Sequence, residues 1–285
     1  MKILCTGDEG FVGTATSKEL ENKHEVVGFD LMGCNDIRDI RHVENAVKET
    51  DCDRILHLAA IARFSDADAD IKRAYETNVE GTRNVAKIAG KYHVPIVYAS
   101  TGSVYMPINY DPPITEDFPV KGNSVYGCSK AVGEQYIKSY NNTYIILRYA
   151  HLYGKEKRGH GLVGGFIERI ERGLAPTLYG GKQSNDFLYI KDVARANRLA
   201  CEAPWDKWNQ SYNIGTGQEL SAEDAGRAVC KATGYTGEIK TVKQREVDAS
   251  RFVYDTTKAE QLGFKAEYNF AEGLKNMFSG QESKK

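Results

Sequence analysis

The sequence lacks the residue patterns that would form a disulfide framework or a metal site. Its six cysteines are scattered along the chain and include no Cys-x-x-Cys pair, and its six histidines form no cluster at ligand spacing. The cysteines are Cys5, Cys34, Cys52, Cys128, Cys201 and Cys230. We therefore expect reduced, mostly packed thiols and no bound metal.

An excess of charge and a long apolar run are also absent. The formal net charge of the 285 residues is -1, and 41% hydrophobic with 27% charged residues is the composition of an ordinary soluble globular protein. Nothing favours binding to nucleic acid or to a membrane. The first strand-like run begins at Lys2 and meets Gly7, which leaves no room for the apolar part of a signal peptide, so we expect a cytoplasmic protein.

The first half of the chain alternates short β-rich runs with helical patterns. The expected strands cover residues 2–6, 25–30, 54–60, 95–100 and 143–150, and the expected helices cover about 11–23, 40–50, 66–91 and 124–141. Several of the strands are apolar throughout, as in a parallel sheet that is covered on both faces. The pattern predicts an α/β fold with a doubly wound parallel sheet.

After residue 150 the pattern loosens into a charged glycine-rich loop (153–165), a helix (162–173), a strand and helix pair (185–203), the stretch "YNIGTG" (212–217) and a C-terminal helical region. We expect a cofactor-binding domain over residues 1–150, with returning segments at about 186–217. A smaller, interleaved substrate lobe would comprise residues 151–185 and 218–285.

The stretch "CTGDEGFVG" joins the first strand to the first helix, with Gly7, Gly10 and Gly13 at intervals of three. Glycines at these places permit a tight turn and let backbone N–H groups at the helix start approach a pyrophosphate. A glycine-rich connection without a ligand is the alternative for the motif alone.

Two acidic residues follow at positions where they could contact the adenosine part of a dinucleotide. Asp30 ends the second strand, where a carboxylate accepts hydrogen bonds from ribose hydroxyls, and no arginine follows it, which favours NAD over NADP. Asp36 and Ile37 are candidates to flank the adenine ring, although Asp36 is equally suited to cap a helix. The small Ala59 and Ala60 end the third strand and would let the cofactor pass close to the backbone.

A tyrosine and a lysine four positions apart occur three times, as Tyr126/Lys130, Tyr153/Lys157 and Tyr254/Lys258. The first pair alone falls inside a long helical pattern, so both side chains project from one face. A free tyrosine has a pKa near ~10 and is a poor base at neutral pH. A nearby ammonium favours the phenolate, so we expect Tyr126 to act as acid and base and Lys130 to assist it. Thr101 is placed to hydrogen-bond the reacting oxygen, whereas turn roles remain open for Ser100 and Ser103.

Several short stretches follow one another along the chain in a characteristic order: "TGDEGFVG", "DIRD", "HLAA", "TNVEGT", "STGSVY", "YGCSK", "LRYAHLYG", "NDFLYIKDVA" and "YNIGTG". In these stretches and their order the chain resembles the extended short-chain dehydrogenase/reductases of the NAD-dependent epimerase/dehydratase family. The resemblance covers nearly the whole chain and implies a Rossmann-type fold that commonly dimerises through its helices at 66–91 and 124–141. It also implies catalysis by Thr101, Tyr126 and Lys130. The NAD-binding residues that it implies are Gly7, Gly10, Phe11, Val12, Gly13, Asp30, Asp36, Ile37, Leu58, Ala59, Ala60, Asn78, Ser100, Tyr126 and Lys130.

The resemblance also narrows the reaction. Dehydratases of this family carry an Asp-Glu pair directly after the active-site threonine, and here those positions hold Gly102 and Ser103. The substrate-binding residues that it implies are Ser103, His151, Asn185 and Arg245. His151 and Asn185 stand where the family's epimerases usually have asparagine and arginine, so the grip on a nucleotide diphosphate departs from the family pattern.

These observations predict an NAD-dependent nucleotide-sugar epimerase that works through a transient keto-sugar. The first alternative is an NAD-dependent sugar dehydrogenase or ketosugar reductase that uses the same residues and releases its product. The second is a non-catalytic NAD-binding protein, against which the presence of Thr101, Tyr126 and Lys130 together argues.

Overall fold

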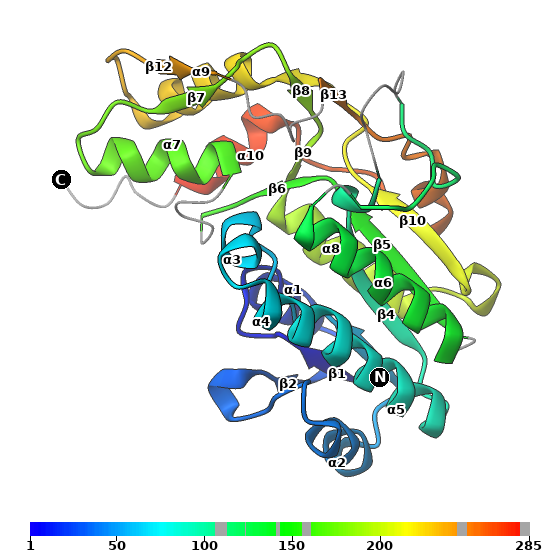
Figure 1. Cartoon of the computed structure of the whole chain (residues 1–285). Coiled ribbons are helices and arrows are strands. Elements are labelled where there is room, and N and C mark those ends of the chain that lie inside the picture. Colours follow the sequence, from blue (N-terminus) through cyan, green and yellow to red (C-terminus); the bar gives the residue numbers. More distant parts are fainter. Residues whose placement is uncertain (106–112, 123, 141–142, 156–160, 244–249, 280–285) are drawn as a thin grey trace.

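The computed structural model describes residues 1–105, 113–122, 124–140, 143–155, 161–243 and 250–279. Its centre is a six-stranded sheet in the order β10-β5-β4-β3-β1-β2, in which every neighbouring pair is parallel (Figure 1). The strands are β1 (Lys2–Thr6), β2 (Glu25–Phe29), β3 (Arg54–His57), β4 (Ile96–Thr101), β5 (Tyr144–Tyr149) and β10 (Gln210–Ile214). The predicted doubly wound parallel sheet is confirmed.

Helices cover both faces of this sheet because successive strand residues point to opposite sides. Ile3 and Leu56 belong to the core that includes residues of α1 (Phe11–Leu20) and α8 (Ile190–Glu202). Leu4 and Ile55 belong to the core of the other face, with residues of α2 (Ile40–Thr50), α5 (Thr82–Tyr92) and α6 (Val125–Tyr140). All four of these strand residues are at most 1% exposed, so the near-continuous apolar strands reflect burial on both faces.

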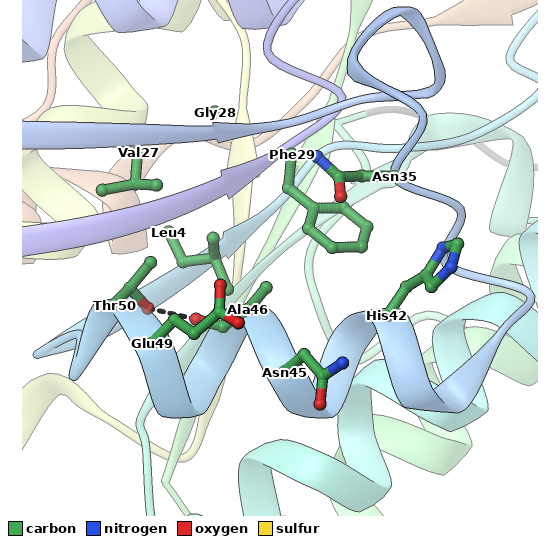
Figure 2. Close-up of a pocket in the computed structure, with 10 residues that line it drawn as sticks. All are labelled: Leu4, Val27, Gly28, Phe29, Asn35, His42, Asn45, Ala46, Glu49 and Thr50. Carbon is green, nitrogen blue, oxygen red and sulfur yellow. Dashed lines mark hydrogen bonds between the residues drawn. The ribbon is translucent and has the colours of Figure 1, made fainter.

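The first half of the sheet is short. After β2 and α2 the chain crosses directly to the far side of β1 and forms β3, so only two strands precede the crossover where a doubly wound half commonly has three. Strand β2 is therefore an edge strand. Figure 2 shows the pocket between β2 and α2, with Phe29 on one side and His42 and Asn45 on the other. It lies away from the carboxyl ends of β3 and β4, where the candidate catalytic residues are found.

The helix expected over residues 66–91 is broken into several pieces. It consists of α3 (Phe64–Ala69), α4 (Ile71–Tyr75), a π-helical segment η2 (Glu76–Gly81) and α5. The break lies at Asp70, whose φ of -139° and ψ of 79° are not helical and whose side chain caps the next helix by accepting from the Arg73 N–H. Asp70 thus ends one helix and starts another, which the hydrophobic spacing alone did not predict.

The remaining elements form a lobe beyond one end of the sheet (top of Figure 1). It contains three small sheets: β6 (His151–Tyr153) with β9 (Phe187–Tyr189), β7 (Thr177–Tyr179) with β12 (Lys240–Val242), and β8 (Ser184–Asn185) between β11 (Leu220–Ser221) and β13 (Arg251–Phe252). Its helices are α7 (Gly161–Glu171), α9 (Ala222–Thr233) and α10 (Phe270–Phe278). The predicted loop over 153–165 therefore includes the end of β6 and the start of α7, and the division of the chain into two domains stays a prediction.

Four short 3-10 helices complete the described structure: η1 (Leu31–Gly33), η3 (Gly102–Val104), η4 (Trp205–Lys207) and η5 (Thr257–Leu262). Within the described ranges no helix has the length and apolar character needed to cross a membrane. The same ranges contain no group of three or more His, Cys, Asp or Glu side chains that could hold a metal ion.

Candidate active site

The glycine turn lies where β1 ends and α1 begins, directly beside the end of β3. Gly7 has a φ of +74°, and a Cβ on it would lie 2.7 Å from the Ala59 backbone. A Cβ on Gly13 would lie 2.0 Å from the Gly7 carbonyl oxygen. Gly10 is the N-cap of α1, so Phe11 and Val12 begin the helix with backbone N–H groups at its positive end. The turn therefore fits a pyrophosphate held by backbone amides.

Two carboxylates meet at the end of β2. Asp30 is half-buried and accepts from the Met32 N–H at 3.1 Å. Asp8, which sequence reasoning missed, lies over Gly28, where an added Cβ would be 2.2 Å from Asp8 Oδ2. Burial, and to a smaller degree the charge of Asp30, raise the pKa of Asp8. Carboxylates at the end of β2 can accept hydrogen bonds from the ribose hydroxyls of NAD, and their negative charge would repel the 2′-phosphate of NADP. This corner therefore favours NAD over NADP.

Asp36 and Ile37 differ in what their side chains contact. Arg38 holds the Asp36 carboxylate through its Nε and Nη2, the latter at 2.6 Å, and lowers the pKa of Asp36. The Ile37 side chain is 5% exposed and packs against Gly81 in the core. The adenine contacts expected of both residues stay a prediction. Helix α2 is capped by Asp39, not by Asp36.

The segment that follows β3 is fixed by buried hydrogen bonds. Ala59 donates its backbone N–H to Thr6 Oγ1 at 3.2 Å, and Leu58 and Ala60 on either side of it are half-buried. Asn78 is fully buried in η2 and bonds both backbone groups of Ile61, at 2.8 and 3.0 Å.

The Asn78 amide also donates to Ser129 Oγ in α6, at 3.0 Å. Asn78 therefore holds the segment that follows β3 against α6, and its expected role at the cofactor stays a prediction.

The three predicted catalytic residues come together at the carboxyl end of β4. Thr101 ends this strand, its hydroxyl donates to Ser103 Oγ at 3.3 Å, and its side chain lowers the pKa of the neighbouring Tyr126 phenol. Tyr126 and Lys130 lie one turn apart on α6. The Tyr126 ring meets the half-exposed ring of Phe64 edge to face, with centroids 5.6 Å apart.

Burial dominates the electrostatics of this group. It raises the pKa of Tyr126 to about 12, against a smaller lowering by the Thr101 hydrogen bond. It lowers the pKa of Lys130 to about 7, opposed by the charge of Glu134. In the protein alone Tyr126 is therefore a neutral phenol, and the expected lowering of its pKa by Lys130 is not found. A positive charge supplied with the cofactor would act in the direction that favours phenolate.

The two competing tyrosines lie in the packed interior. Tyr153 is the last residue of β6 and is 2% exposed, although we expected it in a loop. Tyr254 is 1% exposed and forms an isolated bridge with Ile114. Lys157, the partner of Tyr153, lies outside the described residues.

The residues around Thr101 differ in role. Ser103 donates its backbone N–H to Thr101 Oγ1 at 3.2 Å and stays half-buried at the site. Ser100 points the other way: it is 2% exposed and donates to the Glu134 carboxylate at 2.6 Å. The expectation that Ser100 contacts the cofactor is therefore corrected, since its hydroxyl bonds a carboxylate in the core.

The backbone at Gly102 leaves no space for a side chain. A Cβ there would lie 2.3 Å from Phe252 Cζ and 2.7 Å from the Tyr254 hydroxyl oxygen. Phe252 is 4% exposed and Tyr254 is 1% exposed, so neither ring can move freely. An acidic side chain directly after Thr101 would therefore have to displace these rings.

A buried ion pair holds α6 to β5. Glu134 and Arg148 are 0% and 2% exposed, and Arg148 donates to both carboxylate oxygens at 2.9 and 2.7 Å. Arg148 also donates to the Tyr105 hydroxyl at 2.7 Å, which donates in turn to Asn213. Glu134 lies one turn beyond Lys130, so this pair fixes the part of α6 that carries the catalytic residues.

His151 and Asn185, two of the predicted substrate residues, lie in the lobe. His151 is exposed in β6, and its ring meets the Phe252 ring edge-on at 5.5 Å. Asn185 is paired with Phe252 in register, so the two side chains lie on the same face of their small sheet. Arg251 lies on the opposite face and binds Glu219 at 2.7 Å. Arg245 lies outside the described residues.

The chain matches the family model described as "NAD dependent epimerase/dehydratase family" over residues 3–215. A curated relative, "Putative UDP-glucose 4-epimerase" from Methanocaldococcus jannaschii, is 34% identical, and the match covers 96% of each chain.

Two solved structures are similar over the whole length. The UDP-glucose 4-epimerase of Thermotoga maritima, solved with UDP-glucose, has a TM-score of 0.89 at 29% identity, and the match covers 98% of each chain. The UDP-glucose 4-epimerase of Thermus thermophilus, solved with NAD, has a TM-score of 0.88 at 29% identity and covers 99% of this chain and 100% of the other.

Proposed function

Because this chain belongs to the NAD-dependent epimerase/dehydratase family, we propose that it is an NAD-dependent nucleotide-sugar epimerase acting through a transient keto-sugar. The observation that carries the proposal is that Thr101, Tyr126 and Lys130 meet at the same edge of the parallel sheet as the glycine turn, with Gly102 closed against Phe252.

The chain's own residues supply acid–base chemistry and orientation. NAD, when bound, would supply a hydride acceptor for the carbinol carbon, and inversion would require the hydride to return to the opposite face of the keto-sugar. Tyr126 Oη accepts the carbinol proton and later returns it, while Thr101 Oγ1 donates a hydrogen bond to the same oxygen. Lys130 is proposed to hold the nicotinamide ribose and, when charged, to favour the phenolate form of Tyr126.

Epimerisation fits the site better than the family's other reactions. Elimination of water needs a carboxylic acid next to the carbinol, and Phe252 and Tyr254 fill the place of that side chain at residue 102. A protein that only binds NAD has no need for a threonine, a tyrosine and a lysine arranged around one reacting oxygen.

The relatives point to the first substrate to test. Both similar structures are named UDP-glucose 4-epimerases, so we propose UDP-glucose and UDP-galactose as the first pair. His151 and Asn185 share the face of the lobe that carries Phe252 and are proposed to contact the substrate. We further propose a cytoplasmic homodimer.

The test begins with purified protein to which no cofactor has been added. We expect denaturation to release nearly one equivalent of NAD or NADH, and the native protein to convert UDP-galactose to UDP-glucose without added NAD, followed by NMR. Tyr126→Phe should lose turnover by at least about 100-fold and keep its bound NAD. Protein that binds NAD reversibly and releases NADH with substrate would instead be a dehydrogenase or reductase. Unchanged turnover in Tyr126→Phe would overturn the mechanism.

A further inference from the structure

The ammonium group of Lys130 lies in an unusual environment for a charged group. The residue is 1% exposed, and its Nζ is 4.1 Å from the centroid of the Tyr98 ring. Among the described residues no carboxylate lies within ion-pair distance of Lys130. Burial of an unpaired ammonium favours the neutral amine, so some other group must stabilise the charge if the lysine is to work as a cation.

The titratable groups around Lys130 do not neutralise it. Glu134, one turn further along α6, is bound through both oxygens by Arg148 and also accepts from Ser100. Tyr126, on the same helix, is a neutral phenol because burial raises its pKa to about 12.

His57 on β3 is the remaining titratable neighbour apart from Tyr98. Its two ring nitrogens face the hydroxyls of Thr6 and Thr82 at 2.7 and 3.0 Å. Burial and the charge of Lys130 lower the pKa of His57, so it stays uncharged. The face of the Tyr98 ring, with its centroid 4.1 Å from Nζ, thus contacts the ammonium directly, whereas Glu134 acts on it only through its charge and without an ion pair.

The Tyr98 ring is itself held in place. It is 0% exposed in β4, and its centroid is 5.5 Å from that of His57, its register partner in β3. At its other end, a Cβ on Gly133 would lie 2.2 Å from the Tyr98 hydroxyl oxygen. The ring is therefore wedged between β3 and α6 and cannot turn its face away from Lys130.

We propose that Tyr98 is a positioning residue whose ring face holds the ammonium of Lys130 and keeps it charged in a buried site. The inference rests on the proposed function, because it gives Lys130 a role toward the cofactor. A cation over an aromatic face is attracted by the ring quadrupole, and the attraction grows when water is excluded. The hydroxyl of Tyr98 has no part in this interaction, so phenylalanine should serve as well.

The variants Tyr98→Leu and Tyr98→Phe separate the ring from the hydroxyl. The fraction of bound NAD that each variant retains after dialysis between about pH 5 and about pH 9 is measured on denaturation, together with the pH profile of turnover. In the wild type and in Tyr98→Phe, retention of NAD should fall as Lys130 loses its proton, with a midpoint near the pKa of about 7. In Tyr98→Leu the midpoint should lie lower by about one pH unit.

Two controls keep the outcomes distinct. Tyr98→Met, whose longer and unbranched side chain reaches further along the site of the ring, replaces Tyr98→Leu if the latter does not fold, as judged by thermal melting. Lys130→Met should remove the pH dependence altogether. If Lys130→Met binds NAD and turns over like the wild type, the proposed function has assigned Lys130 wrongly. If Lys130 matters but the leucine and phenylalanine variants share one midpoint, the role of Tyr98 is refuted.

Discussion

At the scale of single residues, the clearest constraint on the reaction is the absence of a side chain at Gly102. We expect Gly102→Asp to lower the free energy of unfolding by about 1–3 kcal/mol and turnover by at least about tenfold. The reason is that the new carboxylate must displace the buried rings of Phe252 and Tyr254. Urea unfolding and the UDP-galactose assay measure the two effects.

The matched control for this substitution is Gly165→Asp. Gly165 lies in α7, and a Cβ there would meet no atom within 4 Å. Both variants replace a glycine by an aspartate, but only at Gly102 does the new side chain meet buried rings. We therefore expect only Gly102→Asp to lower turnover strongly. Equal behaviour of the two, or an active dehydratase from Gly102→Asp, would contradict the packing argument.

Some site residues could be predicted from sequence because their role depends on spacing. Tyr126 and Lys130 are four apart in a helical pattern, and the glycine turn has a fixed interval. For Tyr98 the indication from the sequence is weaker. It lies two residues before Ser100 in β4, so both side chains point to the same face of the sheet, where α6 packs. Asp8 and Phe64 could not be found this way, because their roles depend on contacts with Gly28 and Tyr126 across the fold.

At the scale of elements, α6 must be held against the sheet for Tyr126 and Lys130 to face Thr101. The buried pair of Glu134 and Arg148 does this. We expect Glu134→Gln to lower the free energy of unfolding by about 3–5 kcal/mol, because it leaves the guanidinium of Arg148 buried without a counter-charge. Urea unfolding monitored by circular dichroism measures the loss.

The control for this element is an ion pair of similar length on the surface. Glu168 and Arg172 lie one turn apart on or beside α7, 2.6 Å from each other, with 33% and 68% of their side chains exposed. Glu168→Gln should cost under about 1 kcal/mol. A Glu134→Gln cost as small as that of the control would mean that α6 is held by packing alone.

Helix boundaries show why the elements were only partly predictable. The strands of the first half were found within a few residues because apolar runs mark them. The helix expected over 66–91 was not, because Asp70 breaks it through its own backbone conformation and side-chain cap. Helix α4 and then η2 follow the break, and Asn78 in η2 forms hydrogen bonds with Ile61 and Ser129. A local cap of this kind leaves no periodic signal in a sequence.

At the scale of the whole molecule, the sheet was easier to predict than the lobe. The sheet follows a regular alternation of strand and helix, whereas the lobe is built from strands of two or three residues. Such strands form because distant segments meet, as β8 does with β11 and β13. The site depends on both parts, since Phe252 of the lobe closes Gly102 of the sheet.

The helices beside the site also carry the surface that we expect to form a dimer. Ile71 and Tyr75, one turn apart on α4, are 57% and 52% exposed, and Tyr140 at the end of α6 is 43% exposed. A second copy of the chain that packs its own α4 and α6 on this face would bury these side chains around a twofold axis. In such a dimer the second copy would contact α6, the helix that carries Tyr126.

We therefore expect light scattering to give a mass about twice the 31.7 kDa of one chain. The double variant Ile71→Arg/Tyr75→Arg should shift the protein to the monomer, because it places unpaired charge in an apolar contact. Leu174→Arg is the control, since Leu174 is 47% exposed and lies just after α7 in the lobe. A single-chain mass for the wild type, or a dimer that survives the double variant unchanged, would rule out this face as the interface.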